Sequence, residues 1–473
     1  MRHKACHTVL DEVARVAGIV GFASLAAIAG GMVALPVAAQ VPLRVGGQTL
    51  ANTTLTGNQD ESVVAVDPSG NFLVVWRDDF LDGSLSAIVG RRFSARTGLP
   101  LSGEFVINVA VAGDQRNPAV AMADDGHFVV VWEGPDTLPP VTPGIFGSLR
   151  DANGDPIVAE FQVNTSTSGV QRRPAVAMQP NGSFLVVWED DSPLGKVPNA
   201  DKNIFGCLFP PTFPVGFSCN PFLVNIAMTS GDQEQPATAA NPATGGWFVG
   251  WQGPWMFSPP IPSIYVRVLN AAGGGQNEFG VNTSTSSVLR DHVALSSNTS
   301  GNAVAVWEAA EAPAVSLRDI YSRSIVAGVP TGLEERVNLS TALDEREPSV
   351  ALDERGGFVT VWVVASPAAT AWEETPEGSP IIIQGRKRNG LGVFAGLLPP
   401  PPDSEFQVNT SGDLFLDPWV AAEPHGNFVA AWQATEATAD PDGNGVFYQR
   451  FLDAIFADGF ETANTSRWSA AIP

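Results

Sequence analysis

The sequence predicts an all-β protein, a seven-bladed β-propeller of four-stranded antiparallel blades that is closed by a strand from the N-terminus. The first observation is a tryptophan-bearing segment that recurs at spacings of 56, 56, 63, 56, 55 and 70 residues. A fixed period of this size is typical of units that bury their apolar faces by stacking on one another. The seven tryptophans are Trp76, Trp132, Trp188, Trp251, Trp307, Trp362 and Trp432.

The second observation is the strand pattern within each copy, which lacks helical periodicity. In the third copy, residues 174–178, 184–188, 204–208 and 222–225 are short apolar or β-branched runs typical of strands. The first turn carries glycine in every copy, as Asn181-Gly182 does here, because hairpin turns need positive φ angles. Each tryptophan ends an aliphatic run, so we expect it to pack against the neighbouring blade.

The third observation concerns the ends of the repeat region. The last copy, residues 417–451, has three strands, and a matching strand stands at residues 43–52. Pairing the two closes the ring and removes exposed sheet edges. A β-solenoid, the competing architecture, needs no displaced strand. The predicted propeller spans 40–453, with blades at about 59–109, 117–165, 174–226, 236–283, 290–339 and 347–410, and at 417–451 plus strand 43–52.

An asparagine recurs at the end of each fourth strand. We expect its side chain to cap the following turn, since Asn readily bonds nearby backbone, with ligand binding as the alternative. The seven are Asn52, Asn108, Asn164, Asn225, Asn282, Asn338 and Asn409.

The N-terminus has the pattern of a secretory signal peptide, assigned to residues 1–39. A basic start at Arg2 and Lys4 precedes an apolar stretch, and residues 37–39 form a small-x-small cleavage site. An uncleaved membrane anchor is the alternative. After signal removal no segment reaches the roughly 20 apolar residues of a membrane span. We therefore expect a secreted, periplasmic or cell-surface protein, a monomer, with a separate C-terminal tail at 454–473.

Charge and cysteine content narrow the partners. Lys and Arg number 26 against 49 Asp and Glu, a net charge of −23, which disfavours nucleic acids and anionic lipid. Basic proteins and divalent cations remain possible partners. Of the three cysteines, Cys207 and Cys219 lie in the expected mature chain, and we expect them to form a disulfide between adjacent strands, with two unrelated thiols as the alternative.

The loops between second and third strands carry most of the candidate site. They are rich in acids, among them Asp78, Asp79, Asp190 and Asp191. Trp255 and Trp372 lie in the same class of loop, and exposed aromatic rings beside carboxylates are a common sugar-binding surface. Plain solvation explains the acids equally well, and loop anchoring explains the aromatics.

One segment resembles the start of a calcium loop. Asp440, Asp442 and Asn444, followed by Gly445, match D-x-D-x-N-G, so calcium is a possible cofactor. The twelfth position is Phe451 where an EF-hand needs Glu, so an ordinary turn is the alternative.

The repeat resembles one that is widespread in exported, largely uncharacterised bacterial proteins. Its pattern, V-N-T, Q-x-x-P-x-V-A, D-G-x-F-V-V-V-W and I-F/Y-x-R, covers about residues 43–451. Here it is carried by Val163-Asn164-Thr165, Gln171, Pro174, Val176-Ala177, Asn181-Gly182, Phe184 and Val187-Trp188. The resemblance implies a propeller outside the cell and no particular reaction. Asp124-Asp125-Gly126 and Trp132 are more weakly similar to the Asp-box of sialidase-type propellers, although the spacing departs from it.

Together these features predict an exported binding or scaffold module that recognises a polysaccharide or a surface protein through its acidic loop face. A glycan-cleaving enzyme that uses rim carboxylates is one alternative, and a structural surface protein without a small ligand is another. A non-enzyme is favoured because no histidine triad, His/Cys metal spacing or phosphate-binding glycine loop is present.

Overall fold

The computed structural model describes residues 42–453 except 80, 136–141, 167, 193–201, 215, 228–230, 255–261, 285–288, 311–316, 366–381, 389–404, 411–413 and 436–442. The chain divides into Met1–Ala38 and Ala39–Pro473, and all described residues belong to the second unit. They form 28 strands in seven four-stranded antiparallel sheets. No helix among these residues is long and apolar enough to cross a membrane.

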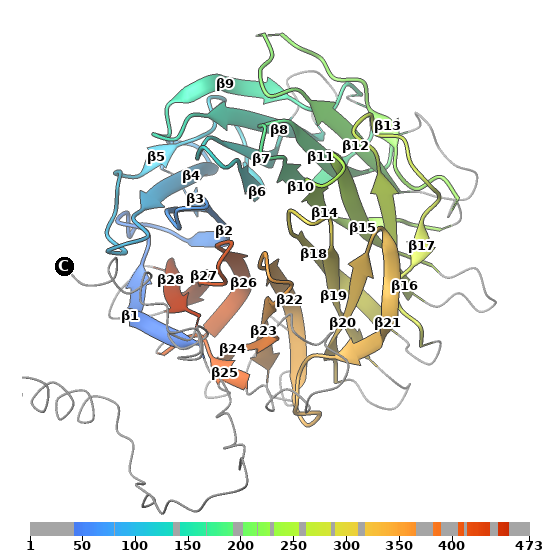
Figure 1. Ribbon diagram of the computed structural model, residues 1–473. Coiled ribbons are helices and arrows are strands. Elements are labelled where there is room, and N and C mark those ends of the chain that lie inside the picture. Colours follow the sequence, from blue (N-terminus) through green and yellow to red (C-terminus); the bar gives the residue numbers. More distant parts are fainter. Residues whose placement is uncertain are drawn as a thin grey trace, which may run out of the picture. The chain divides into compact units, whose positions relative to one another are not determined.

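Each sheet is one blade, and in six blades the strands follow chain order from the centre of the ring outward, while in the seventh β26, β27 and β28 are followed by β1 (Figure 1). Blades one to four are β2 (Gln59–Val66), β3 (Phe72–Asp79), β4 (Ser86–Phe93), β5 (Phe105–Val106); β6 (Arg116–Met122), β7 (Phe128–Pro135), β8 (Pro143–Arg150), β9 (Pro156–Gln162); β10 (Gln171–Met178), β11 (Phe184–Asp190), β12 (Asn203–Phe209), β13 (Phe222–Leu223); and β14 (Glu234–Asn241), β15 (Gly246–Pro254), β16 (Pro262–Leu269), β17 (Phe279–Gly280). Blades five to seven are β18 (Leu289–Ser297), β19 (Ala303–Ala310), β20 (Asp319–Val326), β21 (Val329–Arg336); β22 (Asp344–Leu352), β23 (Phe358–Ala365), β24 (Ile382–Arg388), β25 (Glu405–Gln407); and β26 (Leu414–Ala422), β27 (Phe428–Thr435), β28 (Asn444–Leu452), β1 (Leu43–Leu50).

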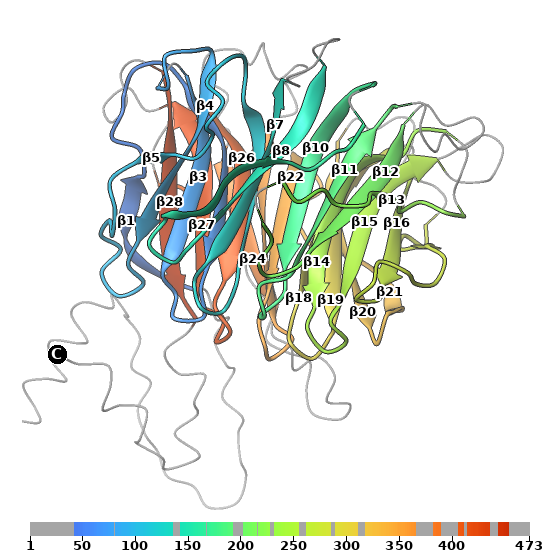
Figure 2. The same ribbon diagram turned by 90° about the horizontal axis from the view of Figure 1, so that it is seen from above.

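The first strands of neighbouring blades contact one another all round the ring, including β26 with β2. Strand β1 pairs antiparallel with β28, from Leu43 opposite Leu452 to Leu50 opposite Phe447. The Ala51 N–H continues the pairing by donating to the Val446 carbonyl at 2.7 Å. The predicted closure of the seventh blade by the N-terminal strand is therefore confirmed, and Figure 2 shows β1 beside β28 from a second direction.

The core lies between blades. All seven repeat tryptophans are at most 1% exposed, which confirms their predicted packing role. At the first junction, Val63 and Val75 of blade one pack with Val130 and Trp132 of blade two. Burying a large aromatic side chain in this way contributes roughly 2–3 kcal/mol per blade.

The recurring asparagines end each blade with a shared hydrogen-bond pattern. In every blade the side-chain oxygen accepts a third-strand backbone N–H, as Asn52 does from Val446 at 2.9 Å and Asn108 from Ile88 at 2.8 Å. In several blades the side-chain nitrogen donates to the carbonyl two residues later, as Asn52 does to Thr54 at 2.8 Å. The predicted capping role is confirmed, and the same side chain also extends the strand pairing.

The predicted pairing of Cys207 with Cys219 is confirmed, but Cys219 precedes β13, so the bond does not tie two adjacent strands as expected. It joins β12 to the segment that follows it. Both cysteines are buried, with Phe209 and Phe213, in the core shared by blades two and three.

Candidate functional site

A ring of seven residues, one per blade, marks the mouth of the central channel. Each lies on the first strand of its blade and has a φ angle near +50°, and each first-strand pairing shifts register at that point, as around residues 60–63 of β2. Non-glycine residues with positive φ are uncommon, and a bulge re-aims the side chain that it carries. This channel ring consists of Glu61, Asn117, Arg173, Gln235, His292, Glu347 and Asp417.

Each channel-ring residue donates its backbone N–H to a side-chain oxygen of the preceding blade. At four junctions the acceptor is the residue that follows the repeat tryptophan. These acceptors are Glu133 for the Arg173 N–H (2.6 Å), Glu189 for Gln235 (2.6 Å), Glu308 for Glu347 (2.8 Å) and Gln433 for Glu61 (3.0 Å). At the other three junctions the acceptor is the side chain of the preceding channel-ring residue. These acceptors are Glu61 for the Asn117 N–H (2.5 Å), Gln235 for His292 (2.8 Å) and Glu347 for Asp417 (3.1 Å).

The choice of acceptor follows from the sequence. Where the tryptophan is followed by Arg77, Gln252 or Val363, the channel-ring residue bridges to the next blade instead. A bond therefore crosses every blade junction. A positive φ costs on the order of 1–3 kcal/mol per residue, so the strain is tolerated because the surrounding contacts hold it.

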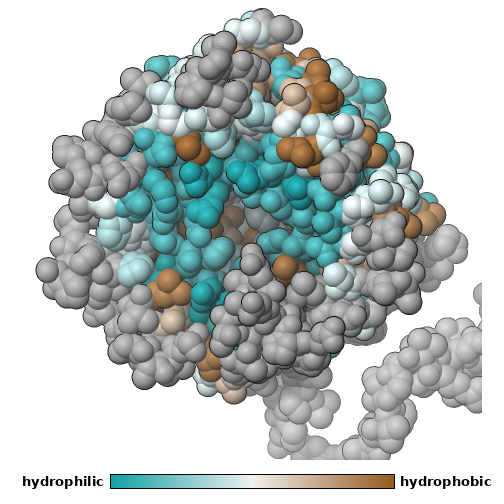
Figure 3. All heavy atoms as spheres, turned by 180° about the vertical axis from the view of Figure 1, so that it is seen from behind, coloured by the Kyte–Doolittle hydropathy of each residue, from teal (hydrophilic) through white to brown (hydrophobic). Residues whose placement is uncertain are grey.

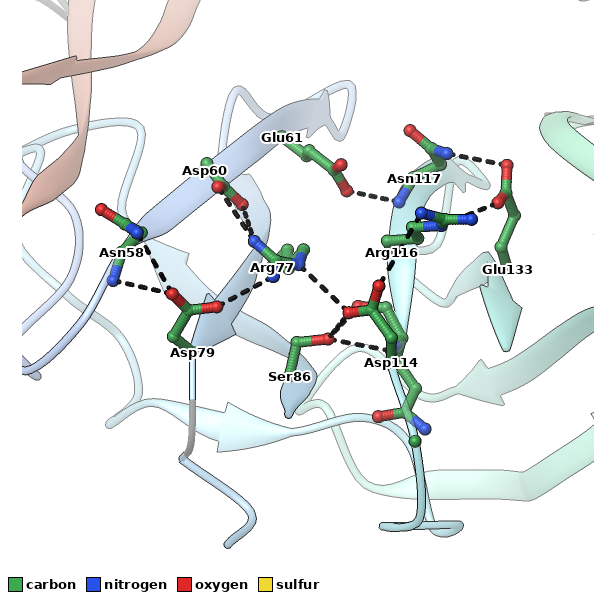
Figure 4. A network of polar contacts seen from close by, with 12 residues as sticks. Asn58, Asp60, Glu61, Arg77, Asp79, Ser86, Asp114, Arg116, Asn117 and Glu133 are labelled. Atoms are coloured by element: carbon green, nitrogen blue, oxygen red, sulfur yellow. Dashed lines mark hydrogen bonds and ion pairs between the residues drawn. The ribbon is translucent and has the colours of Figure 1, made fainter. Parts of the chain in front are cut away.

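Arg77 organises the junction between blades one and two (Figure 4). Its guanidinium lies 3.0 Å from Asp60, 2.9 Å from Asp79 and 3.5 Å from Asp114. Beyond it, Asn117 donates to Glu133 at 2.7 Å. Arg116 also approaches Asp114 at 3.8 Å and Glu133 at 3.2 Å, so in this network two arginines face the four carboxylates of Asp60, Asp79, Asp114 and Glu133.

Acidity is greatest where blades six, seven and one meet. Burial and neighbouring carboxylates raise the pKa of Glu61 to about 7. Burial and the nearby charge of Asp417 raise the pKa of Glu347 above its ordinary range. Asp417 keeps an exposed surface, yet desolvation by the surrounding protein and the charge of Asp60 raise its pKa as well. Protons or a bound hydrogen-bond donor would both relieve this repulsion.

A histidine faces the same sector. His292 Nδ1 lies 3.2 Å from Glu308 and 3.6 Å from Asp291, and ligand atoms of the three lie within 4.8 Å of one another. Burial lowers the pKa of His292, but the hydrogen bond and charge of Glu308 outweigh that effect and raise it to about 9. Metal binding needs a neutral imidazole, and Arg318 already pairs with Glu308 at 2.5 Å. The group is therefore better described as a charged hydrogen-bond network than as a metal centre.

The acids predicted from the loops take different places. Asp78 is fully buried and accepts from Trp76 Nε1 at 3.3 Å, and Asp190 is 4% exposed and accepts from Trp188 Nε1 at 3.2 Å. Burial raises the pKa of Asp78 to about 7. These two carboxylates face the core.

Of the remaining predicted site residues, the structure describes three and leaves four outside its described residues. Asp79 is held by Arg77, and Asp191 accepts from the Val170 N–H at 2.5 Å. Asn444 begins β28. Trp255, Trp372, Asp440 and Asp442 lie outside the described residues, as do the expected signal peptide and the tail.

The channel ring was missed at the sequence level, although a signal for it exists. Its members occupy one aligned position, two residues after Gln59, Gln115, Gln171 and Gln233 in the first four blades. They are polar and differ in chemistry while their surroundings repeat. Figure 3 shows hydrophilic residues gathered around the middle of the ring. A separate hollow of about 260 Å³, lined by first-strand residues such as Met122 and Met178 and by Glu354, lies toward the hairpin turns.

Known proteins are similar to this chain only distantly. No protein-family model and no curated protein sequence matches the chain. Among solved structures, an unknown-function protein from Dyadobacter fermentans aligns at 10% identity and a TM-score of 0.47, covering 88% of this chain and all of that one. An ulvan lyase aligns at 8% identity and a TM-score of 0.49, covering 89% of this chain and 96% of that one. A Penicillium chrysogenum α-L-arabinanase aligns at 12% identity and a TM-score of 0.42, covering 72% of this chain and 93% of that one. These similarities are too distant to carry a functional argument.

Proposed function

We propose that this protein is an exported binding module that holds a carbohydrate chain at the mouth of its central channel. The observation that carries the proposal is the channel ring. Seven equivalent positions share one strained backbone conformation and one inter-blade hydrogen bond, and differ in their side chains. A constant scaffold that presents varied polar groups around an opening is suited to selective recognition.

The chemistry of the ring favours a ligand rich in hydroxyl groups. Glu61, Glu347 and Asp417 supply acceptors, while Arg173 and His292 supply donors. Sugar hydroxyls act as both donor and acceptor. The net charge of −23 disfavours polyanions, and the crowded carboxylates of blades six, seven and one favour a ligand that donates hydrogen bonds.

The test is binding of the full chain to a broad glycan array, followed by titration of any retained glycan. Glu347→Gln and Asp417→Asn keep side-chain size but change the acceptors of the mouth, and we expect each to weaken binding about tenfold or more. His127→Ala is the matched control, because His127 follows a hairpin turn away from the ring. Failure to retain any glycan, or an equal loss with His127→Ala, contradicts the proposal.

A second candidate is a glycan-cleaving enzyme, favoured by the Glu347 and Asp417 pair. The two carboxyls interact, and both pKa values are raised by desolvation and neighbouring charge. Two interacting carboxyls of unequal acidity can act as proton donor and base in glycoside hydrolysis. Mass spectrometry of the retained glycan after prolonged incubation separates the candidates, since shortened or unsaturated products require catalysis and an unchanged glycan supports binding alone.

A further inference from the structure

In blades one to five, a residue at or next to the start of the first strand reaches back to the loop that links its blade to the preceding one. In blades one to four this residue is glutamine, and its side-chain nitrogen donates to a loop carbonyl: Gln59 to Thr56, Gln115 to Ala112, Gln171 to Ser168 and Gln233 to Gly231, each at 3.2 Å. In blade five, Arg290 takes over and donates to the Ser284 and Pro262 carbonyls. These loop carbonyls therefore face a hydrogen-bond donor in five blades.

Blade six breaks this pattern, because the equivalent residue is Glu345, two positions before Glu347. Glu345 is 1% exposed, and neither carboxylate oxygen accepts a hydrogen bond within the described chain. Ala342 stands three residues earlier, as Thr56 and Ala112 do before their glutamines. A carboxylate offers no N–H to such a carbonyl, so a buried, uncompensated acceptor replaces a donor.

The surroundings of Glu345 add negative charge. Burial, together with the carboxylates of Asp319, Glu405 and Asp344, raises the pKa of Glu345 to about 8. Asp319 accepts a hydrogen bond from the Asn338 side chain at 2.6 Å. The equivalent residue of blade three is Asn203, which accepts from the Asn225 side chain at 3.1 Å. The positions of Gln171 and Asn203, which are neutral in blade three, are thus acidic at the junction of blades five and six, as Glu345 of β22 and Asp319 of β20.

The basic side chains that adjoin this junction in the sequence pair with carboxylates other than Glu345. Arg346 pairs with Asp344, and Arg318 pairs with Glu308. Arg336 approaches Asp319 at 3.9 Å from a position that is 38% exposed. The carboxylates around the buried Glu345 therefore outnumber the basic side chains that pair with them.

We propose that a divalent cation of the calcium class binds at this junction between blades five and six, held by the carboxylates of Glu345 and Asp319 and the carbonyl oxygen of Ala342. Calcium prefers six to eight hard oxygen ligands, which carboxylates, carbonyls and water supply. The ion provides the positive charge that glutamine and arginine donors provide at the other junctions. The site is separate from the channel mouth and does not depend on the proposed carbohydrate function.

The test uses the full chain, dialysed against a chelator and then returned to millimolar calcium, with bound calcium measured by elemental analysis and stability by thermal melting. Glu345→Gln and Asp319→Asn are the test variants, and both are expected to fold because blade three carries Gln171 and Asn203 at these positions. We expect calcium to raise the wild-type melting temperature by about 3 °C or more. Each variant loses this response and about one equivalent of bound calcium.

Asp440→Asn is the control, because residues 440–445 form the other candidate calcium loop; it should keep the full response of the Glu345 site. The proposal is overturned if the wild type gains no stability from calcium, or if Glu345→Gln responds as the wild type does. It is also overturned if Asp440→Asn alone removes the response. A Glu345→Gln variant that is more stable than a calcium-insensitive wild type would show that a proton, and not a metal ion, neutralises Glu345.

Discussion

Replacing Asp78 by asparagine should stabilise the protein, and by more as the pH rises. The Asp78 carboxylate is fully buried, and its Oδ1 has no hydrogen-bond partner among the described residues. Burial, with added repulsion from Glu104 and Asp79, raises its pKa from 3.8 to about 7. The folded state therefore holds this proton more tightly than the unfolded chain, so Asp78 reduces stability progressively as the pH rises from about 4 to about 7, and fully above that.

The size of the effect follows from the pKa. One pKa unit corresponds to about 1.4 kcal/mol, so the stability gain from Asp78→Asn should grow by roughly 2–3 kcal/mol between pH 5 and pH 8. The gain stops growing above the folded pKa, since Asp78 is then ionised in both states. Guanidinium denaturation of wild type and variant at several pH values measures the difference directly.

Asp190→Asn is the matched control for this experiment. Asp190 also accepts from its repeat tryptophan, but its second oxygen accepts the Ser192 N–H at 2.7 Å. Asp190→Asn should therefore destabilise the protein by about 1 kcal/mol, because an amide nitrogen cannot replace an acceptor. A pH-independent effect of Asp78→Asn, or a stabilisation by Asp190→Asn as large as that by Asp78→Asn, would refute the reasoning.

Two further predictions concern the junctions between blades. Glu133→Ala should destabilise by about 3–5 kcal/mol in denaturant titration, because the buried carboxylate accepts from Arg116, Asn117 and the Arg173 N–H. Glu335→Ala should change the free energy of unfolding by no more than about 0.5 kcal/mol, since Glu335 is 61% exposed in its pair with Arg388. Equal losses of stability in the two variants would contradict a stabilising role for the inter-blade hydrogen bonds. Replacing the Cys207–Cys219 disulfide by two serines should cost about 3 kcal/mol in the same assay, as expected for a closed loop of twelve residues, and an unchanged midpoint would show that it adds no stability.

The sequence was sufficient for the fold because the fold repeats. Tryptophans at a fixed period, glycine turns and a displaced strand at residues 43–52 leave few alternatives to a closed ring. The role of Asn52 and its counterparts was predictable for the same reason, since a short amide at a strand end bonds local backbone.

The site was harder to predict because local sequence does not show which way a side chain points. Asp78 and Asp190 were interpreted as loop acids. Asp78 is the second-to-last residue of β3 and Asp190 is the last residue of β11, and each accepts from a buried indole. Glu61 and Asp417 lie within first strands, and local sequence does not show the bulge at which each of them lies. Comparing the seven copies position by position, and looking for a polar position that varies, is the signal that would have found them.

The most direct test of the central claim is calorimetric titration of a retained glycan into the wild type and into a variant that combines Glu61→Gln, Glu347→Gln and Asp417→Asn. The combined variant removes the acidic sector of the channel mouth and leaves the core residues unchanged. The proposed function predicts measurable binding by the wild type and a loss of at least about a hundredfold in affinity in the variant, with its melting temperature maintained. Equal affinity for both proteins would contradict a binding site at the channel mouth.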